Sequence, residues 1–183
     1  MNYDKDKLKG DIKEEIFFEF SKKFKEYTLI DVRRLEQYKK IDVDYIALKK
    51  NNTYAKIEVK SLGKGDTLFI ELFDNIKNKN KGWYSKTQTD ILAFVGKDKI
   101  VLIQLKDIKK YIDVYMPELD ELMDGDIQKL HERLLVFEDY LHPVIIEDIN
   151  AWDKKQWGLC LKLNIKKLKY EGCKVRTFSY NEK

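Results

Sequence analysis

The sequence predicts an α/β protein with a layered fold, in which helices flank a mixed central β-sheet. An amphipathic helix near the start of the chain, a charged hairpin after it, and two short apolar strands before a second helix all favour this class. The chain of 183 residues is long enough for one domain with a substantial core. We expect a core over residues 1–115 and a C-terminal α+β elaboration over 116–183 that packs on the core rather than folding independently.

The first predicted element is a helix at Lys7–Tyr27. Lysine and glutamate fill most positions between its apolar residues, which predicts one buried stripe. At about 100° per residue, Glu15 and Glu19 fall near an edge of this stripe, and Glu14 falls on the far side. The residues of the stripe recur every four positions: Leu8, Ile12, Ile16, Phe20 and Phe24.

The central prediction is a hairpin. Residues 41–48 alternate in a strand pattern, Asn51-Asn52 supplies turn chemistry, and Tyr54–Lys60 returns as the second strand. Side chains of a strand alternate between its two faces, so Glu58 and Lys60 point the same way.

The charges of this hairpin suggest metal chemistry. Asp42 and Asp44 both point, by alternation, to the face that carries Glu58 and Lys60. Two carboxylates on neighbouring strands can hold a hard divalent cation, and a nearby ammonium group can steer a water or offset negative charge. A strand-edge acid that only makes hydrogen bonds is the alternative for Asp44.

The counts of histidine and cysteine exclude several kinds of site. With only His131 and His142, the chain lacks the histidines of an HNH nuclease or a zincin, and two cysteines are too few for a zinc ribbon. Cys160 and Cys173 are far apart, so we expect reduced core thiols. A metal site must therefore be built mainly from carboxylates, which suits Mg²⁺ or Mn²⁺.

The remaining elements are assigned from periodicity and turn signals. Thr67–Asp74 is expected to be a third central strand, with Glu71, Phe69 and Phe73 on one face. Asn75–Gln88 is expected to be a loop. The other expected elements are strands at Thr28–Arg33, Asp90–Val95 and Ile100–Gln104, a helix at Leu105–Tyr115, a helical acidic stretch at Pro117–Tyr140, and strands at Gly158–Ile165 and Lys174–Tyr180.

Charge is distributed unevenly, although the net charge is only +4. A basic loop followed by aromatic residues can neutralise phosphates and stack on unpaired bases, which makes it a candidate nucleic-acid contact. Trp83 and Tyr84 could instead cap the core. The candidate contact residues are Lys64, Lys77, Lys79, Lys81, Trp83 and Tyr84. The segment 113–139 is strongly acidic and is a candidate contact for a protein partner.

Asp44 and Glu58-Val59-Lys60 resemble the PD-(D/E)XK nuclease superfamily, whose pattern is an acid that opens one strand and Glu-x-Lys on the next. Residues 44–47, Asp-Tyr-Ile-Ala, are similar to a form seen in archaeal-type Holliday-junction resolvases, which favours Asp44 over Asp42. Residues 68–71 and 82–90 look like a phage and bacterial branch. The resemblance covers about residues 8–106.

The resemblance implies a restriction-endonuclease-like fold and a metal-dependent endonuclease that hydrolyses DNA. Asp44, Glu58 and the carbonyl group of Val59 would hold Mg²⁺ or Mn²⁺, and Lys60 would position the attacking water or stabilise the phosphate. A glutamate of the first helix, Glu15 or Glu19, would assist. The substrate would be branched DNA, or duplex ends or sites, and a two-strand cut would call for a homodimer.

Two other functions stay open. The chain could be a nucleic-acid-binding or assembly subunit that keeps the fold without the chemistry, or a protein-interaction module acting through residues 113–139. No apolar run is long enough to span a bilayer, and no apolar signal segment opens the chain. We therefore expect a cytoplasmic protein without membrane association.

Overall fold

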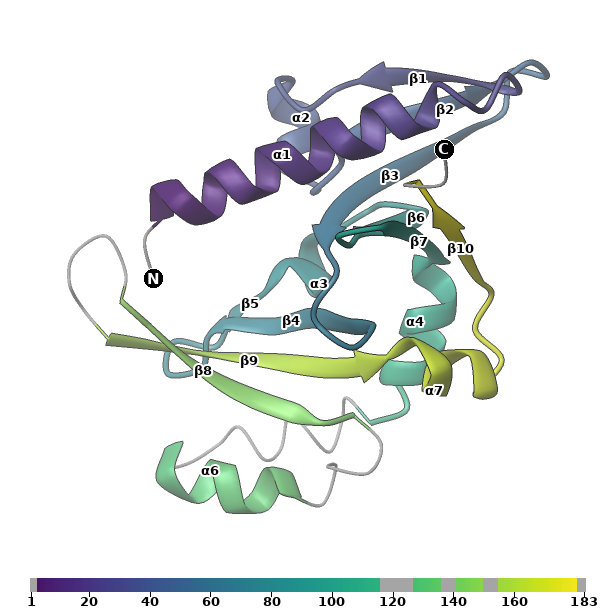
Figure 1. Ribbon diagram of the computed structural model, residues 1–183. Helices are drawn as coiled ribbons and strands as arrows, with labels where there is room; N and C mark the ends of the chain where they lie inside the picture. The colour runs from purple at the N-terminus through teal and green to yellow at the C-terminus, as the bar shows by residue number, and fades with distance from the viewer. Residues whose placement is uncertain (1–2, 116–126, 136–140, 150–154, 181–183) are drawn as a thin grey trace.

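The computed structural model describes residues 3–115, 127–135, 141–149 and 155–180 (Figure 1). It is an α/β structure with a mixed sheet of six strands, a second, antiparallel sheet, and helices around them. The helices are α1 (Tyr3–Ser21), α2 (Glu36–Lys39), α3 (Trp83–Lys86), α4 (Leu105–Ile112), α6 (Ile127–Leu134) and α7 (Ile165–Tyr170). The strands are β1 (Tyr27–Asp31), β2 (Tyr45–Lys49), β3 (Tyr54–Ser61), β4 (Thr67–Asn75), β5 (Asn80–Lys81), β6 (Ile91–Val95), β7 (Lys99–Gln104), β8 (Pro143–Ile149), β9 (Lys155–Asn164) and β10 (Val175–Ser179).

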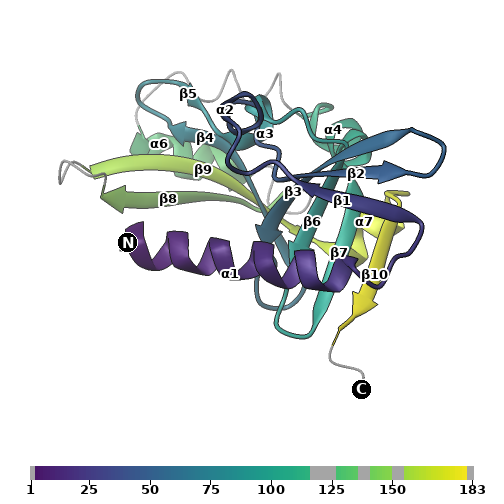
Figure 2. The same ribbon diagram turned by 90° about the horizontal axis from the view of Figure 1, so that it is seen from above.

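The six-stranded sheet has the order β1-β2-β3-β6-β7-β10 (Figure 2). Its strands pair antiparallel except at its centre, where β3 and β6 run parallel. A parallel pair needs a crossover connection, and here β4, β5 and α3 form it. The central strand β3 therefore lies between its hairpin partner β2 and a strand reached by way of the second sheet.

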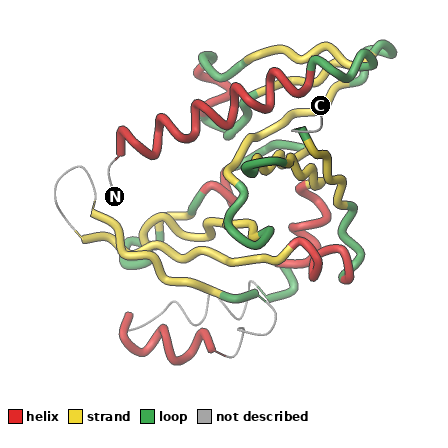
Figure 3. The backbone as a smooth tube through the Cα atoms, in the orientation of Figure 1, coloured by secondary structure: helices red, strands yellow, loops and turns green. Residues whose placement is uncertain are grey.

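Helix α1 lies along one face of the central sheet (Figure 3). Phe17 and Phe20 are buried there against strand residues that include Ile57 and Val59. The predicted stripe was wrong in its first half, because Leu8 and Ile12 are 60% and 50% exposed. The buried side of α1 is centred on Phe17 and Phe20 rather than on the fourfold repeat.

The second sheet has the order β5-β4-β9-β8, so the prediction that Thr67–Asp74 is a central strand was wrong. Leu68, Ile70 and Leu72 of β4 are fully buried, as alternation predicts. A β-bulge between Glu71 and Phe73 breaks the alternation, and Phe73 joins the core with the leucines instead of sharing the face of Glu71.

The predicted core and the predicted elaboration share both sheets. Strand β4 pairs with β9 along most of its length, and β10 pairs with β7 at the edge of the central sheet. One large apolar cluster unites β4, β6, β7 and α4 with α6, β9 and α7. Both ends of the chain therefore contribute to each layer of the molecule.

Residues 75–88 differ from the prediction. The predicted loop contains the short strand β5 and the helix α3, whose start packs on β4. In the described part of the chain, no helix combines the length and apolar character needed to cross a bilayer. The prediction of a partner-binding acidic segment at 113–139 falls largely on residues 116–126 and 136–140, which lie outside the described residues.

Candidate functional site

Asp44 and Glu58 are held next to each other across the β2–β3 hairpin. The backbone N–H of Asp44 donates to the Ile57 carbonyl oxygen at 2.9 Å. The N–H of Val59 donates to Asp44 Oδ2 at 2.7 Å, which fixes the carboxylate against β3. Strand β2 begins only at Tyr45, and Asp42 has a φ of 48° in the preceding turn. The expectation that Asp42 and Asp44 alternate along one strand was therefore wrong.

Glu58 and Lys60 point to the same face of β3, as period-two alternation predicts. Their carboxylate and ammonium groups form an ion pair. The intervening Val59 and the preceding Ile57 pack on the opposite face, with α1. The side chain of Glu58 is only 6% exposed and that of Lys60 is 27% exposed, so the pair reaches solvent mainly through the lysine.

The electrostatic environment raises the pKa of both acids. Burial, reinforced by the charge of Glu58, raises the pKa of Asp44 to about 8, although the Val59 N–H acts in the opposite direction. Burial also raises the pKa of Glu58, while the charge and hydrogen bond of Lys60 lower it. Two neighbouring carboxylates in this position favour either a shared proton or a bound cation.

Lys60 remains a cation at neutral pH. Burial lowers the pKa of its ammonium group, but the charge and hydrogen bond of Glu58, together with the charge of Asp44, raise it above its ordinary value. Its Nζ also lies 5.0 Å from the centroid of the Trp83 ring, within the range of a cation–π contact.

The donor set fits a hard divalent cation. Glu58 Oε2 is buried and has no hydrogen-bond partner among the described residues, which is costly unless something fills that position. Oxygen ligands from carboxylates suit Mg²⁺ or Mn²⁺. In the described ranges, however, no group of three or more His, Cys, Asp and Glu side chains is arranged to hold a metal. An ion here would need backbone oxygens, water or substrate to complete its shell.

The structure couples Glu14 of α1 to the two acids, whereas the side chains of Glu15 and Glu19, the residues preferred from the sequence, are 60% and 57% exposed. The charge of Glu14 contributes to the raised pKa of both Asp44 and Glu58. Its Oε2 accepts from Arg33 Nη1 at 2.9 Å, whereas the side chain of Glu15 is 60% exposed. Since Glu14 lies three residues before Phe17, it falls one turn along the side of the helix that is actually buried. The spacing of Glu14 from Phe17 is the signal in the sequence that points to this residue.

The two aromatic candidates have different environments. Trp83 is half-buried, its backbone N–H donates to Glu71 Oε2 at 3.3 Å, and its ring contacts Lys60. Tyr84 is only 3% exposed, and its hydroxyl group donates to Asp113 Oδ1 at 2.8 Å. Its ring is part of the apolar core and is not available for stacking on a base.

The lysine candidates lie on the surface at both ends of β4. Lys64 is exposed in the loop between β3 and β4. Lys77, Lys79 and Lys81 are exposed between the end of β4 and α3, and the Nζ of Lys81 lies 4.3 Å from the centroid of the Phe73 ring.

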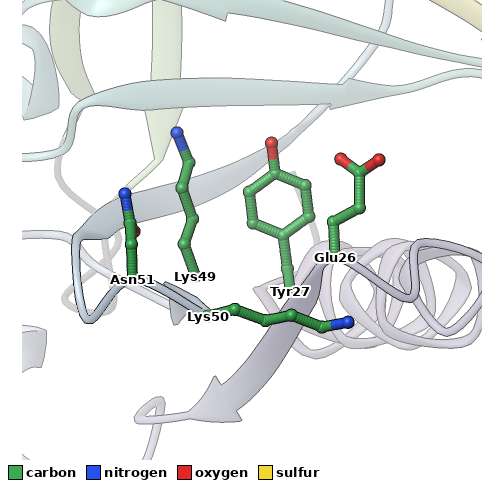
Figure 4. A pocket seen from close by; sticks show the side chains of 5 residues that line it. All are labelled: Glu26, Tyr27, Lys49, Lys50 and Asn51. Carbon is green, nitrogen blue, oxygen red and sulfur yellow. The ribbon is translucent and has the colours of Figure 1, made fainter.

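A surface pocket of about 300 Å³ lies elsewhere (Figure 4). It is lined by Glu26, Tyr27, Lys49, Lys50 and Asn51. Lys49 is at the far end of β2 from Asp44, so this pocket is separate from the acid pair.

The chain has no match among protein-family models, curated proteins or solved structures.

Proposed function

We propose that this protein is a Mg²⁺- or Mn²⁺-dependent nuclease with a restriction-endonuclease-like core, as the resemblance of Asp44 and Glu58-Val59-Lys60 to PD-(D/E)XK nucleases implies. One observation carries the proposal. Asp44 and Glu58 lie together in a poorly solvated position, Lys60 pairs with Glu58, and Glu58 Oε2 has no partner among the described residues. Two features of the fold are consistent with the proposal: helix α1 packs on one face of a mixed sheet, and the β2–β3 hairpin lies beside the parallel pair of β3 and β6.

Asp44, Glu58 and the carbonyl oxygen of Val59 would hold the ion. When bound, it supplies a water of lowered pKa and offsets negative charge on the phosphoryl oxygens. The Val59 N–H orients the Asp44 carboxylate. The Lys60 ammonium donates toward the scissile phosphate and stabilises charge that develops on it. Burial limits the access of bulk water to Glu58.

A labelled panel of single-stranded, duplex, flap and four-way-junction DNA, incubated with Mg²⁺, Mn²⁺ or EDTA, tests the proposal. We expect metal-dependent cutting that falls about 100-fold or more in Lys60→Ala. Binding in Ca²⁺ should change far less. Lys56→Ala, four residues earlier on the same strand, is the matched control and should cut like the wild type. Equal cleavage by the wild type and Glu58→Gln would remove the assignment.

The alternative is a nucleic-acid-binding subunit without catalysis. The specific observation in its favour is that the described residues offer only two carboxylates and no third clustered ligand. It predicts binding that is the same in wild type and Lys60→Ala, no cutting in any metal, and no effect of Mg²⁺ on the melting temperature.

A further inference from the structure

One face of the second sheet carries Phe69 and Lys162, and the β3–β4 loop and α7 add Lys64 and Lys166 next to it. We name these four residues the Lys162 surface. Register places Phe69 of β4 directly opposite Lys162 of β9, so both side chains share one face. Glu71 lies two residues from Phe69 and shares that face. All four members of the surface are exposed, Phe69 by 38%.

The β3–β4 loop joins this surface to the strand of the acid pair. Gly63 lies so close to Phe69 that a Cβ on it would come within 2.7 Å of the ring. The N–H of Ile165 donates to the Asp66 carbonyl oxygen at 3.1 Å, and Asn164 Nδ2 donates to the Gly65 carbonyl oxygen at 3.3 Å. These contacts hold Lys64 and the start of α7, with Lys166, beside each other.

The lysines of this surface are available to an anion. Among the described residues, the side chains of Lys64, Lys162 and Lys166 form no ion pair, whereas the nearby Asp66 is paired with Lys99. A large apolar ring between unpaired lysines suits a sugar–phosphate backbone, which presents charge and apolar surface together.

Contacts through Trp83 place the acid pair of Asp44 and Glu58 near the middle of β4, the strand that carries Phe69 of the Lys162 surface. The carboxylate of Glu71, in the middle of β4, accepts from the backbone N–H of Trp83, and the ring of Trp83 contacts Lys60. Lys162 lies two residues along β9 from Cys160, the partner of Glu71, or about 7 Å at the strand rise of about 3.4 Å per residue. The lysines at 77–81 follow the other end of β4.

We infer that the backbone of a nucleic acid runs along β4, contacting the Lys162 surface on one side of the acid pair and the lysines at 77–81 on the other. The inference rests on the proposed function for the role of the acid pair, but the contact itself needs no catalysis. The nine residues of β4 span about 27 Å, the length of about eight base pairs. A site contacted on both sides would act within a strand rather than at its end.

Charge reversal with a matched control tests the inference. Lys162→Glu/Lys166→Glu is compared with Lys25→Glu/Lys50→Glu. Both control lysines are exposed, Lys50 lines the pocket of Figure 4, and Lys25 precedes Glu26 of the same lining. Each pair lowers the formal net charge from +4 to 0, so a difference between them reports position rather than total charge. Binding of a labelled duplex of about 20 base pairs is measured by fluorescence anisotropy in Ca²⁺ over a series of salt concentrations.

We expect the Lys162/Lys166 pair to bind at least about 10-fold more weakly and to lower the slope of log K against log salt by about 2. The control pair should stay within about twofold of the wild type. Lys162→Gln/Lys166→Gln should lose affinity in the same direction, and circular dichroism checks that each variant is folded. Equal losses in both reversal pairs, no loss in the Lys162/Lys166 pair, or wild-type binding to phosphatidylserine vesicles but not to DNA would each overturn the inference.

Cleavage in Mg²⁺ by the same proteins separates the two proposals. If the wild type cuts DNA but binding does not depend on Lys162 and Lys166, the inferred path of the nucleic acid is wrong and the proposed nuclease activity stands. If binding depends on these lysines but no protein cuts DNA, the proposed nuclease activity is wrong and the inferred path of the nucleic acid stands.

Discussion

Asp44 carries an energetic cost in the folded protein when no cation is bound. The pKa of its carboxyl group is raised to about 8, mainly by burial, while an unfolded chain would titrate near the ordinary value of 3.8. Between these two values the folded state holds a proton that the unfolded state has released. The free energy of unfolding should therefore fall as pH rises from about 4 to about 8 and level off above.

Asp44→Asn should weaken this dependence on pH. We expect its free energy of unfolding at pH 8, in EDTA, to exceed that of the wild type by about 1–3 kcal/mol, with a shallower slope between pH 4 and 8. Urea unfolding at several pH values measures both quantities.

Asp31→Asn is the control of opposite sign. The hydrogen bond from Arg33 lowers the pKa of Asp31, so this carboxylate stabilises the fold above its ordinary pKa and loses that contribution as pH falls. Its substitution should destabilise the protein slightly at neutral pH. A gain in stability from both substitutions would indicate a general effect of net charge.

Divalent cations should stabilise the wild type through the same pair of acids. Saturating Mg²⁺ or Mn²⁺ relieves the repulsion between Asp44 and Glu58, so the melting temperature should rise with ion concentration. Glu58→Gln should lose most of this rise, while Glu15→Gln, an exposed substitution on α1, should keep it. Differential scanning fluorimetry makes the measurement, and an equal rise in all three proteins would place the ion elsewhere.

At the scale of residues, the sequence alone predicted that Glu58 and Lys60 point to the same face of their strand, because side chains alternate strictly within an unbroken strand. It was insufficient for Glu14, because the exposed Leu8 and Ile12 extend the apolar repeat of α1 and shift the predicted buried side of the helix. It also left Trp83 and Tyr84 as equivalent candidates, and only tertiary packing separates the half-buried ring beside Lys60 from the buried one.

Among the elements, the junction between β5 and α3 positions Trp83 against Lys60. Gly82 is the N-cap of α3 and lies against β4, where a Cβ would come within 2.5 Å of the Glu71 carbonyl oxygen and 2.6 Å of its Cγ. Because one of these neighbours is backbone, the strand or the helix must move to admit a larger residue.

Gly82→Ala should therefore destabilise the protein by about 2 kcal/mol or more and displace Trp83. Gly10→Ala is the matched control, since nothing lies within 4 Å of its added Cβ and helix propensity favours alanine by about 1 kcal/mol. Thermal unfolding and the emission of the tryptophans measure the two effects. Equal stability of both variants would show that the β5–α3 junction adapts to the added methyl group.

Strands that pair with their neighbours in sequence could be predicted from the sequence, but the sheet to which β4 belongs could not. Strands β6 and β7 and the β2–β3 hairpin pair with sequence neighbours through short turns, which leave clear signals. Strand β4 pairs with β9, far along the chain, and its apolar pattern is the same for either sheet. Periodicity therefore identified the strand but could not assign its neighbour.

Across the whole molecule, the interlocking of the two sheets makes residues 1–115 dependent on the rest of the chain. A fragment ending at 115 would lack β9 and β10 and would expose apolar β4 and β7 residues that the full chain buries. We expect this fragment to lose cooperative thermal unfolding, measured by circular dichroism. Cooperative unfolding of the fragment would show that the first part folds alone.

Leu161→Ala, at a fully buried position on β9, should lower the free energy of unfolding of the full chain by about 2–5 kcal/mol. Leu135→Ala, at a position that is 63% exposed, should lower it far less.

The parallel junction between β3 and β6 has a consequence for the order of folding. The β2–β3 and β6–β7 hairpins each close a short turn, while the β3–β6 contact must wait for the intervening residues of the second sheet to be ordered. We therefore expect both hairpins to form early and the β3–β6 ladder late. A partly folded chain would thus have Asp44 and Glu58 paired on their hairpin before Trp83 reaches Lys60, so the acid pair would be assembled first and its aromatic side would be completed last.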